Sequence, residues 1–470
     1  MFDHLKDLLF KNKQGKEDCL IANIYVPDTV QKNLPVLVYV HGGGFGFGHG
    51  NFVVPKIVQS HNIIVVTFNY RLGVNGFLCL GTPSAPGNAG MKDQVALLRW
   101  VKRNIEYFGG NPDDVTIAGS SAGSASVDLL MLSPITKGLF NKVIPESGAN
   151  LGLYAIQLDP IENAREFAKG HNFSGIYDAR ALESFYKTAS VETVISNPLF
   201  ARKDSKLFSP CIERDVGEEI FLAENPYDIL NNGNYEKIPM LYGFANMEGI
   251  AFLEILDAWK NDMNNKFSNF LPMDLQLNEV EKTEVASRIK EFYFGEKEIG
   301  YENVLGFIDY MTDTMFMVPV MRAIQLHVKA GHKKIFLYEY SYTDETAPLV
   351  PHTNVRGATH CAQSIALVDD SKGFSNVTCD EHSPGYIAMK HTIREIWSNF
   401  IKTGSPVPEG SLLPSWPPTG SYGNPYMSLG RPVDLVSRPM HEKRFRIWEE
   451  LYKEHYRAPT PPPVYSRDEL

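Results

Sequence analysis

A serine within a run of small residues is the strongest candidate for chemistry in the sequence. The segment Gly119–Gly123 reads Gly-Ser-Ser-Ala-Gly and fits the pattern GxSxG, with Ser121 at its centre. The preceding run, Val115–Ala118, is strand-like, and a helix can begin at Ala122. A serine on such a turn exposes its hydroxyl beside the N–H groups of a helix start. This context predicts a nucleophile for acyl transfer, whereas the pentapeptide alone is more typical of an unreactive turn.

Two further side chains could complete a catalytic triad. A serine hydroxyl needs a base, and the base needs an orienting carboxylate. One known chain order for these groups is serine, acid, histidine. His360 lies late in the chain, and Glu248 directly follows the apolar run Pro239–Phe244. Chain order does not exclude His352 as the base, and Glu339 is a weaker rival as the acid because it lies within a strand-like run.

A glycine-rich segment could stabilise the negative charge that develops during acyl transfer. His41-Gly42-Gly43-Gly44 directly follows the apolar run Leu34–Val40. Consecutive glycines allow backbone N–H groups to turn inward, so Gly43 and Gly44 could form an oxyanion hole together with Ala122. The alternative interpretation is a flexible turn. None of the five cysteines has metal-ligand spacing, so we expect no metal site.

Strands and helices alternate around these residues. Continuous apolar runs are typical of a parallel sheet that is covered on both faces, and strands that alternate with helices predict an α/β fold. Residues about 153 to 330 are helix-rich, with one strand candidate inside, and we interpret them as helical excursions over a pocket. The expected strands are Leu34–Val40, Ile63–Phe68, Val115–Ala118, Pro239–Phe244 and Ile335–Tyr340, and the expected helices include Met91–Ile105, Ile387–Ile401 and Arg444–Tyr456.

Composition restricts the class of protein. The chain has 470 residues, of which 43% are hydrophobic and 21% charged, the balance of a globular protein. Its net charge of −10 argues against a nucleic-acid partner, because acidic surfaces repel phosphates. No run reaches about 18 apolar residues, so no membrane span is expected. Five cysteines argue against a disulfide scaffold but leave one or two bridges possible.

Beyond the serine motif, the sequence resembles the type-B carboxylesterase/cholinesterase family of α/β-hydrolases, in a pattern similar to insect esterases. Two segments carry most of the likeness: Glu17–Leu20 with Asn23–Pro27, and Phe108–Pro112 leading into the serine turn. Other similar segments are His41–Phe45, Asn69–Gly73, Gly87–Gly90, Asp93-Gln94, Asn246–Gly249, Gly357–His360, Trp416-Pro417 and Tyr426-Met427.

The resemblance implies an α/β-hydrolase fold and a cofactor-free hydrolase that acts on small or medium carboxylic esters, such as xenobiotic, pheromone, hormone or lipid esters. Ser121 would be the nucleophile, His360 the base and Glu248 the acid. Gly43, Gly44 and Ala122 would donate to the oxyanion. Residues 1–457 would form one catalytic domain, and the Pro-rich residues 458–470 a flexible tail.

A second hypothesis is an impaired or truncated relative with an adhesion or interaction role. The presence of all three triad residues disfavours it, but two departures from the family pattern keep it open. Ser120 stands where family members commonly carry an acidic residue before the nucleophile. Only 16 residues precede Glu17, whereas the family has a longer segment there. By resemblance, that segment would supply edge strands, part of the gorge and the disulfide partner of Cys19.

Signals for localisation point in two directions. The chain ends in Arg467-Asp468-Glu469-Leu470, which is similar to the KDEL retention signal, but its N-terminus does not resemble a signal peptide. We expect the lumen of the endoplasmic reticulum if a missing leader carried a signal peptide, and otherwise the cytoplasm. Asn172 and Asn376 lie in N-glycosylation triplets, which matter only on entry into that lumen.

Overall fold

The structure is a computed structural model that describes residues 17–52, 61–195, 208–368 and 379–465. Asn376 and the terminal Arg467–Leu470 motif lie outside the described residues.

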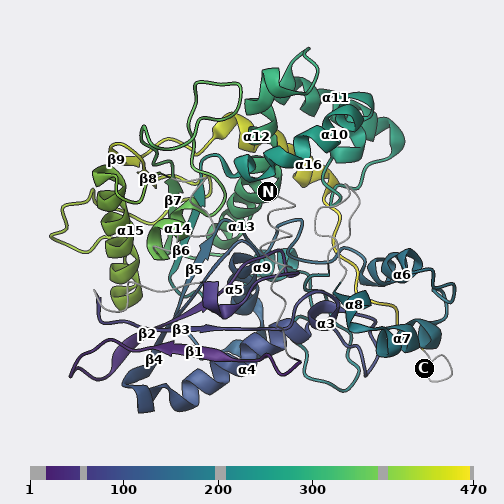
Figure 1. Ribbon diagram of the computed structural model, residues 1–470, viewed down its shortest axis with the longest axis horizontal. Helices are drawn as coiled ribbons and strands as arrows, with labels where there is room; N and C mark the ends of the chain where they lie inside the picture. Colours follow the sequence, from purple (N-terminus) through teal and green to yellow (C-terminus); the bar gives the residue numbers. More distant parts are fainter. Residues whose placement is uncertain (1–16, 53–60, 196–207, 369–378, 466–470) are drawn as a thin grey trace.

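A single mostly parallel sheet forms the centre of the fold (Figure 1). In the described part of the chain it has nine strands, in the order β1-β3-β2-β4-β5-β6-β7-β8-β9. Only the edge strands β1 and β9 pair antiparallel to their neighbours. The strands are β1 (Ala22–Tyr25), β2 (Leu34–Val40), β3 (Ile64–Phe68), β4 (Gly110–Ser120), β5 (Lys142–Glu146), β6 (Met240–Ala245), β7 (Ile335–Tyr340), β8 (Tyr426–Leu429) and β9 (Val433–Val436). The expected α/β architecture is confirmed.

The sheet is covered on both faces because its strands are apolar on both sides. In β2, Val36 and Val38 belong to one hydrophobic core, while Leu37 and Tyr39 belong to a second core on the opposite face. The first core includes side chains of α4 (Ala89–Asn104), α5 (Ala122–Leu132) and α13 (Val318–Lys329). The second includes side chains of α14 (Ala362–Val368) and α15 (Pro384–Thr403).

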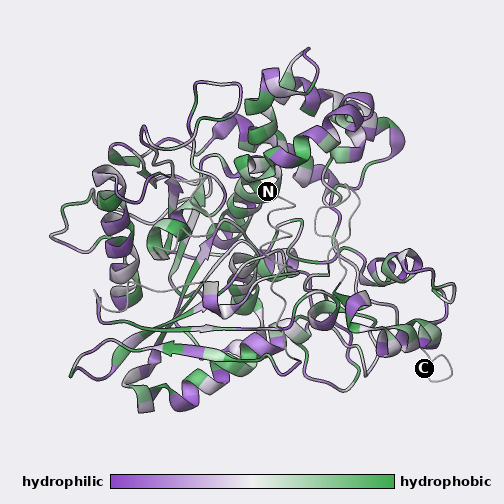
Figure 2. Cartoon of the chain, viewed as in Figure 1, coloured by the Kyte–Doolittle hydropathy of each residue, from purple (hydrophilic) through white to green (hydrophobic). Residues whose placement is uncertain are grey.

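Helical excursions leave the sheet between β5 and β7. The stretch expected to be helix-rich contains one strand, β6, as predicted. In Figure 1, α10 and α11 lie with α16 at one end of the molecule, apart from α6, α7 and α8. Figure 2 shows hydrophobic and hydrophilic residues on the same helices, as expected where one face packs on protein. The remaining helices are α3 (Gly73–Phe77), α6 (Pro160–Gly170), α7 (Ala179–Thr188), α8 (Val191–Val194), α9 (Pro226–Asn232), α10 (Leu253–Asn265), α11 (Glu279–Phe294), α12 (Val304–Thr312) and α16 (Glu442–His455).

One long apolar helical stretch lies inside this region. Tyr301–Lys329 includes α12, the π-helical turn Asp313–Met317 and α13, and it is long and apolar enough to cross a membrane. However, 78% of its most apolar window is buried inside the protein, as in a core helix of a soluble protein. The absence of a membrane span therefore stays a prediction.

The Pro-rich segment after α16 makes hydrogen bonds to other parts of the protein. The backbone N–H and the hydroxyl of Thr460 both donate to the carbonyl of Leu158, at 2.9 and 3.0 Å. Arg214 Nε donates to the carbonyl of Pro462 at 2.7 Å. Proline has no N–H, but its carbonyl remains an acceptor, so a Pro-rich segment can still be held by donors on the body. The assignment of residues 458–470 as a flexible tail stays a prediction, and the last five of them lie outside the described residues.

One disulfide, between Cys79 and Cys211, joins positions 132 residues apart. Cys19, Cys361 and Cys379 are not in a disulfide, so one of the possible bridges is present.

Candidate active site

The candidate catalytic residues meet because four neighbouring parallel strands end at the same edge of the sheet. Ser121 directly follows β4, and Ser147 directly follows the next strand, β5. Glu248 lies three residues after β6, and His360 lies in the long connection between β7 and α14. The carboxyl edge of such a sheet is where α/β proteins assemble their sites.

Ser121 occupies a strained turn that close packing enforces. Its backbone has φ 57° and ψ −120°, a combination rare for any residue except glycine, and its N–H donates to the carbonyl of Glu146 at 2.8 Å. The flanking glycines allow the strand and helix to approach each other. A Cβ on Gly119 would lie 2.3 Å from the carbonyl oxygen of Gly123, and one on Gly123 would lie 2.1 Å from that of Val40. The predicted strand-to-helix turn is confirmed as a local structure.

His360 and Glu248 form a close pair. Nδ1 of His360 lies 2.5 Å from Oε2 of Glu248, whose side chain is fully buried. The other carboxylate oxygen, Oε1, accepts from the N–H of Ala245 at 2.7 Å and from the hydroxyl of Ser147 at 2.6 Å. Since both oxygens have partners, the buried carboxylate is fixed toward the imidazole.

The two rivals are placed elsewhere. His352 is exposed, and its ring packs on that of Tyr301 at 4.6 Å. Glu339 lies within β7 and contacts His441. Of the candidate acid–base pairs considered from the sequence, the structure brings together Glu248 and His360.

Two further neighbours complete the surroundings of the His360 ring. Phe316, in the π-helical turn, packs against the ring with 4.4 Å between centroids. The thiol of Cys361 lies 3.4 Å from Nε2. Burial by itself would lower the pKa of His360, but the charges of Cys361 and Glu248 together outweigh burial and raise that pKa.

The glycine segment after β2 lies beside the serine. A Cβ on Gly42 would come within 3.1 Å of the Cβ of Ser121. Gly43 and Gly44 have φ of 114° and 57°, and a Cβ on Gly43 would lie 2.1 Å from the carbonyl oxygen of Phe47, so this tight turn requires glycine. Within the described residues, the N–H groups of Gly43, Gly44 and Ala122 donate to no other protein group. A group of neighbouring N–H groups without protein partners is typical of an anion-binding pocket.

A buried polar network that the sequence did not reveal supports the acid and the histidine loop. Gln363 Nε2 donates to the Ser147 hydroxyl at 2.6 Å, and Ser364 Oγ donates to Glu146 Oε2 at 2.9 Å. Burial raises the pKa of Glu146 to about 8. These bonds tie the start of α14 to the end of β5. The only feature of the sequence that pointed toward this network was the short apolar run Val143-Ile144, which precedes Ser147.

Ser120 points away from the reacting group. Its hydroxyl accepts from the Tyr39 hydroxyl at 3.1 Å, and in the sheet it stands opposite Glu146. The neutral residue that replaces the usual acid is therefore part of the sheet packing.

A mostly apolar cavity of about 430 Å³ is connected to the candidate catalytic residues through Tyr154. Tyr154 contributes to its wall, donates to the carbonyl of Ser147 at 3.3 Å and lies 6.1 Å from the ring of Phe316, measured between centroids. Because Phe316 also packs on His360, a chain of ring contacts leads from the cavity wall to His360. The other lining residues are Leu153, Ile156, Gln157, Leu158, Asp159, Glu162, Asn163, Ser209, Trp259, Met263, Asn269, Phe270, Leu271, Pro272, Met273, Tyr310, Met311, Thr314, Met315 and Arg457.

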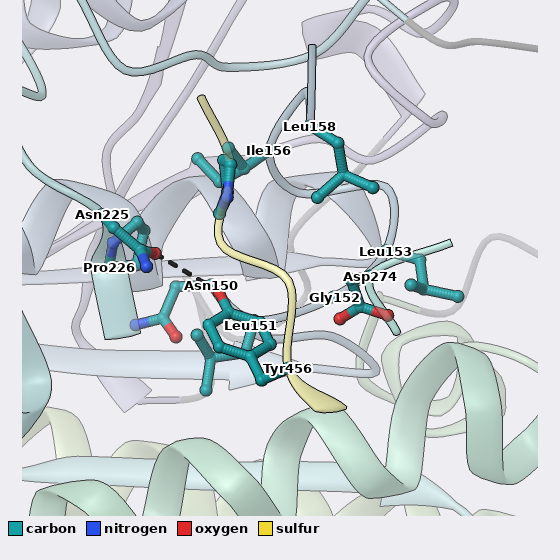
Figure 3. A pocket seen from close by; sticks show the side chains of 11 residues that line it. Asn150, Leu151, Gly152, Leu153, Ile156, Leu158, Asn225, Pro226, Asp274 and Tyr456 are labelled. Carbon is teal, nitrogen blue, oxygen red and sulfur yellow. Dashed lines mark hydrogen bonds between the residues drawn. The ribbon is translucent and has the colours of Figure 1, made fainter. Parts of the chain in front are cut away.

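A second cavity, shown in Figure 3, has a volume of only about 20 Å³. Tyr456 donates to Asn225 at 3.4 Å on one side of it, and both polar atoms of the buried Asn150 lack a protein partner. Its size suits a single water molecule rather than a substrate. Among the residues that the structure describes, no group of three or more His, Cys, Asp or Glu side chains could hold a metal ion.

The chain is similar to known proteins over most of its length. Residues 3–448 match the model of the carboxylesterase family. Juvenile hormone esterase of Tribolium castaneum is 34% identical over 438 residues, which cover 87% of this chain and 74% of that protein. Bile salt-activated lipase of Bos taurus is 31% identical, covering 93% of this chain and 76% of that protein.

A solved structure shares the fold closely. Juvenile hormone esterase from Manduca sexta, with OTFP covalently attached, superposes with a TM-score of 0.82 at 28% identity, covering 95% of this chain and 87% of that one. PNB esterase superposes with a TM-score of 0.70, also at 28% identity, covering 92% of this chain and 85% of that one. This chain therefore belongs to the carboxylesterase family and is a carboxylic ester hydrolase with the α/β-hydrolase fold.

Proposed function

We propose that the protein hydrolyses carboxylic esters through a Ser121-His360-Glu248 triad and an acyl-enzyme intermediate. The observation that carries this proposal is the buried, fully hydrogen-bonded pair of Glu248 and His360, which lies at the same sheet edge as the strained Ser121 turn. Because Nδ1 faces the carboxylate, Nε2 is the nitrogen left to accept a proton.

The mechanism follows from these positions. His360 Nε2 takes the hydroxyl proton as Ser121 Oγ attacks the ester carbonyl. The N–H groups of Gly43, Gly44 and Ala122 bind the oxyanion. His360 then returns the proton to the leaving alcohol, and a water molecule, activated in the same way, releases the acid. Among the described residues, Ser121 Oγ has no hydrogen bond to His360, and this bond would form in the substrate complex, as is common for serine hydrolases.

A fluorophosphonate probe tests the triad directly, because such probes react mainly with activated serines. We expect one adduct per chain, which peptide mass spectrometry should place on Ser121. An adduct on another serine, or no adduct on a folded sample, would contradict the proposed nucleophile and favour an impaired relative.

The cavity supports esters with an apolar group of medium size, such as xenobiotic, pheromone, hormone or lipid esters. Its volume of about 430 Å³ lies in the range of small-molecule sites, and most of its lining side chains are apolar. The similar insect proteins include a juvenile hormone esterase, which agrees with a substrate of this kind. We infer that one apolar arm of the ester occupies this cavity while the carbonyl lies at Ser121.

Filling the cavity should change the preference for chain length. Met315 lines it and is only half-buried, so tryptophan there can reduce the volume with little disturbance of the core. We expect Met315→Trp to lower kcat/KM for p-nitrophenyl octanoate about 10-fold or more relative to p-nitrophenyl acetate. If both esters are affected equally, the acyl arm does not enter this cavity.

Activity should depend on pH through His360. Its raised pKa means that the protonated imidazole is favoured in the folded protein, and only the neutral form can act as the base. The kcat/KM should therefore fall as the pH falls, with a midpoint above the ordinary histidine value of about 6.5. A profile measured with a neutral ester that is flat, or that has its midpoint below this value, would contradict a histidine base in these surroundings.

A further inference from the structure

The catalytic base has an unexpected neighbour at its reacting nitrogen. Cys361 Sγ lies 3.4 Å from Nε2 of His360, within the range of a hydrogen bond to sulfur, and Nδ1 of the same ring is held by Glu248. An imidazole oriented by a carboxylate is the arrangement that activates thiol nucleophiles as well as serines. Two possible nucleophiles, Ser121 and Cys361, therefore share one base.

The backbone keeps the thiol in this position. Cys361 has φ of 61°, in the left-handed region that favours glycine, and it begins the turn into α14, whose next residues are bonded to the β5 end. Its side chain is partly exposed and is not in the disulfide. Cys379 is different, because it is buried and burial raises the pKa of its thiol to about 11.

We propose that Cys361 is a reactive thiol whose covalent modification by small disulfides or thiosulfonates switches the ester hydrolysis off. This inference rests on the proposed function of Ser121 and His360. The Cys361 proton passes to His360 Nε2 or to solvent, and the thiolate attacks one sulfur of the disulfide. A mixed disulfide forms at Cys361, and the other half leaves as a thiolate.

The modified side chain blocks the base by occupying space. The added group has to lie beside Nε2, in the space through which Ser121 Oγ and the second-step water must reach this nitrogen. Because thiol–disulfide exchange is reversible, a reducing thiol restores the free cysteine and, with it, access to the base.

Methyl methanethiosulfonate is a suitable probe because it is small and uncharged. The thiolate takes its methylthio group, and methanesulfinate leaves. We expect treatment of the whole protein to place one methylthio group on Cys361 and to lower hydrolysis of p-nitrophenyl acetate about 100-fold, the contribution of a general base. Dithiothreitol should restore the activity. Complete modification of Cys361 with unchanged activity, or no reaction at Cys361, would overturn the proposal.

Three variants sharpen this test. Cys361→Gly suits the backbone conformation and should hydrolyse the ester in the presence of the reagent, and Cys361→Ser should be equally resistant. Cys19→Ser is the matched control, because Cys19 is also free and partly exposed, and this variant should be inactivated as fast as the unchanged protein. Inactivation that persists in both Cys361 variants would overturn the assignment.

The rate of labelling separates this inference from the proposed function. We expect His360→Gln to slow the methylthiolation of Cys361 about 10-fold or more, because the thiolate loses its imidazole partner. Mass spectrometry measures this rate without any ester hydrolysis. If the protein hydrolyses no ester before treatment, the proposed function fails. If the unchanged protein and His360→Gln are labelled at equal rates, the activation of Cys361 by His360 is overturned.

Discussion

Replacing Ser121 with alanine is expected to lower kcat for ester hydrolysis by about 10⁶, the size of effect found when a triad nucleophile is removed. The remaining turnover should come from the oxyanion hole and binding alone. The turn itself should persist, because the Ser121 N–H still donates to Glu146 and no side-chain contact of the hydroxyl is lost. The measurement is hydrolysis of p-nitrophenyl acetate by protein with an unchanged circular dichroism spectrum.

Ser120→Ala is the matched control for this experiment. It removes a hydroxyl one residue away, which accepts from Tyr39 rather than facing the candidate base. We expect a change in kcat of less than about 10-fold, from the loss of one hydrogen bond. If Ser120→Ala abolished hydrolysis while Ser121→Ala retained it, the assignment of the nucleophile would be wrong.

Glu248→Gln should have the second largest effect, a loss of about 10⁴ in kcat. The amide can still accept from Ala245 and Ser147 through its oxygen, so the fold should be kept. Its NH₂ group would face Nδ1 of His360, favour the tautomer with the proton on Nε2, and so remove the acceptor that Ser121 needs. Stopped-flow or steady-state hydrolysis compared with Glu339→Gln measures this difference.

Glu339→Gln is informative because this residue is the acid that chain order also allowed. From β7 it contacts His441 at the start of α16, and its replacement should affect stability more than turnover. If Glu339→Gln lost more kcat than Glu248→Gln at equal folded fraction, the assignment of Glu248 as the acid would be wrong.

The central strands and the serine turn could be predicted because local sequence determines them. The strand expected at Ile335–Tyr340 matches β7, and the expected helix after Met91 begins two residues earlier, at Ala89. Ser121 was predicted from the small residues around it, and packing explains why: larger side chains would clash with Val40 and Gly123. Buried strands appear in the sequence as continuous apolar runs, and close backbone contacts appear as small residues. Each of these patterns lies within one segment of the chain.

Features that depend on distant contacts could not be predicted. Strand β5 is only five residues long and contains Pro145, which argues against a strand when read alone. Ser147 matters because of Glu248 and Gln363, which are far away in sequence. Phe316 reaches His360 from a π-helical turn, and hydrophobic periodicity does not reveal such turns.

The candidate site is built from residues that follow four different strands, and this has a consequence for folding. Ser121 and His360 are separated by 239 positions in the numbering, so the triad depends on contacts of very high sequence separation. Chains with such contact order fold slowly, and no early, locally folded intermediate can contain the assembled site. Reaction of Ser121 with an activity-based probe during refolding should therefore report the final assembly of strands β4, β5, β6 and β7, later than the helical signal recovers.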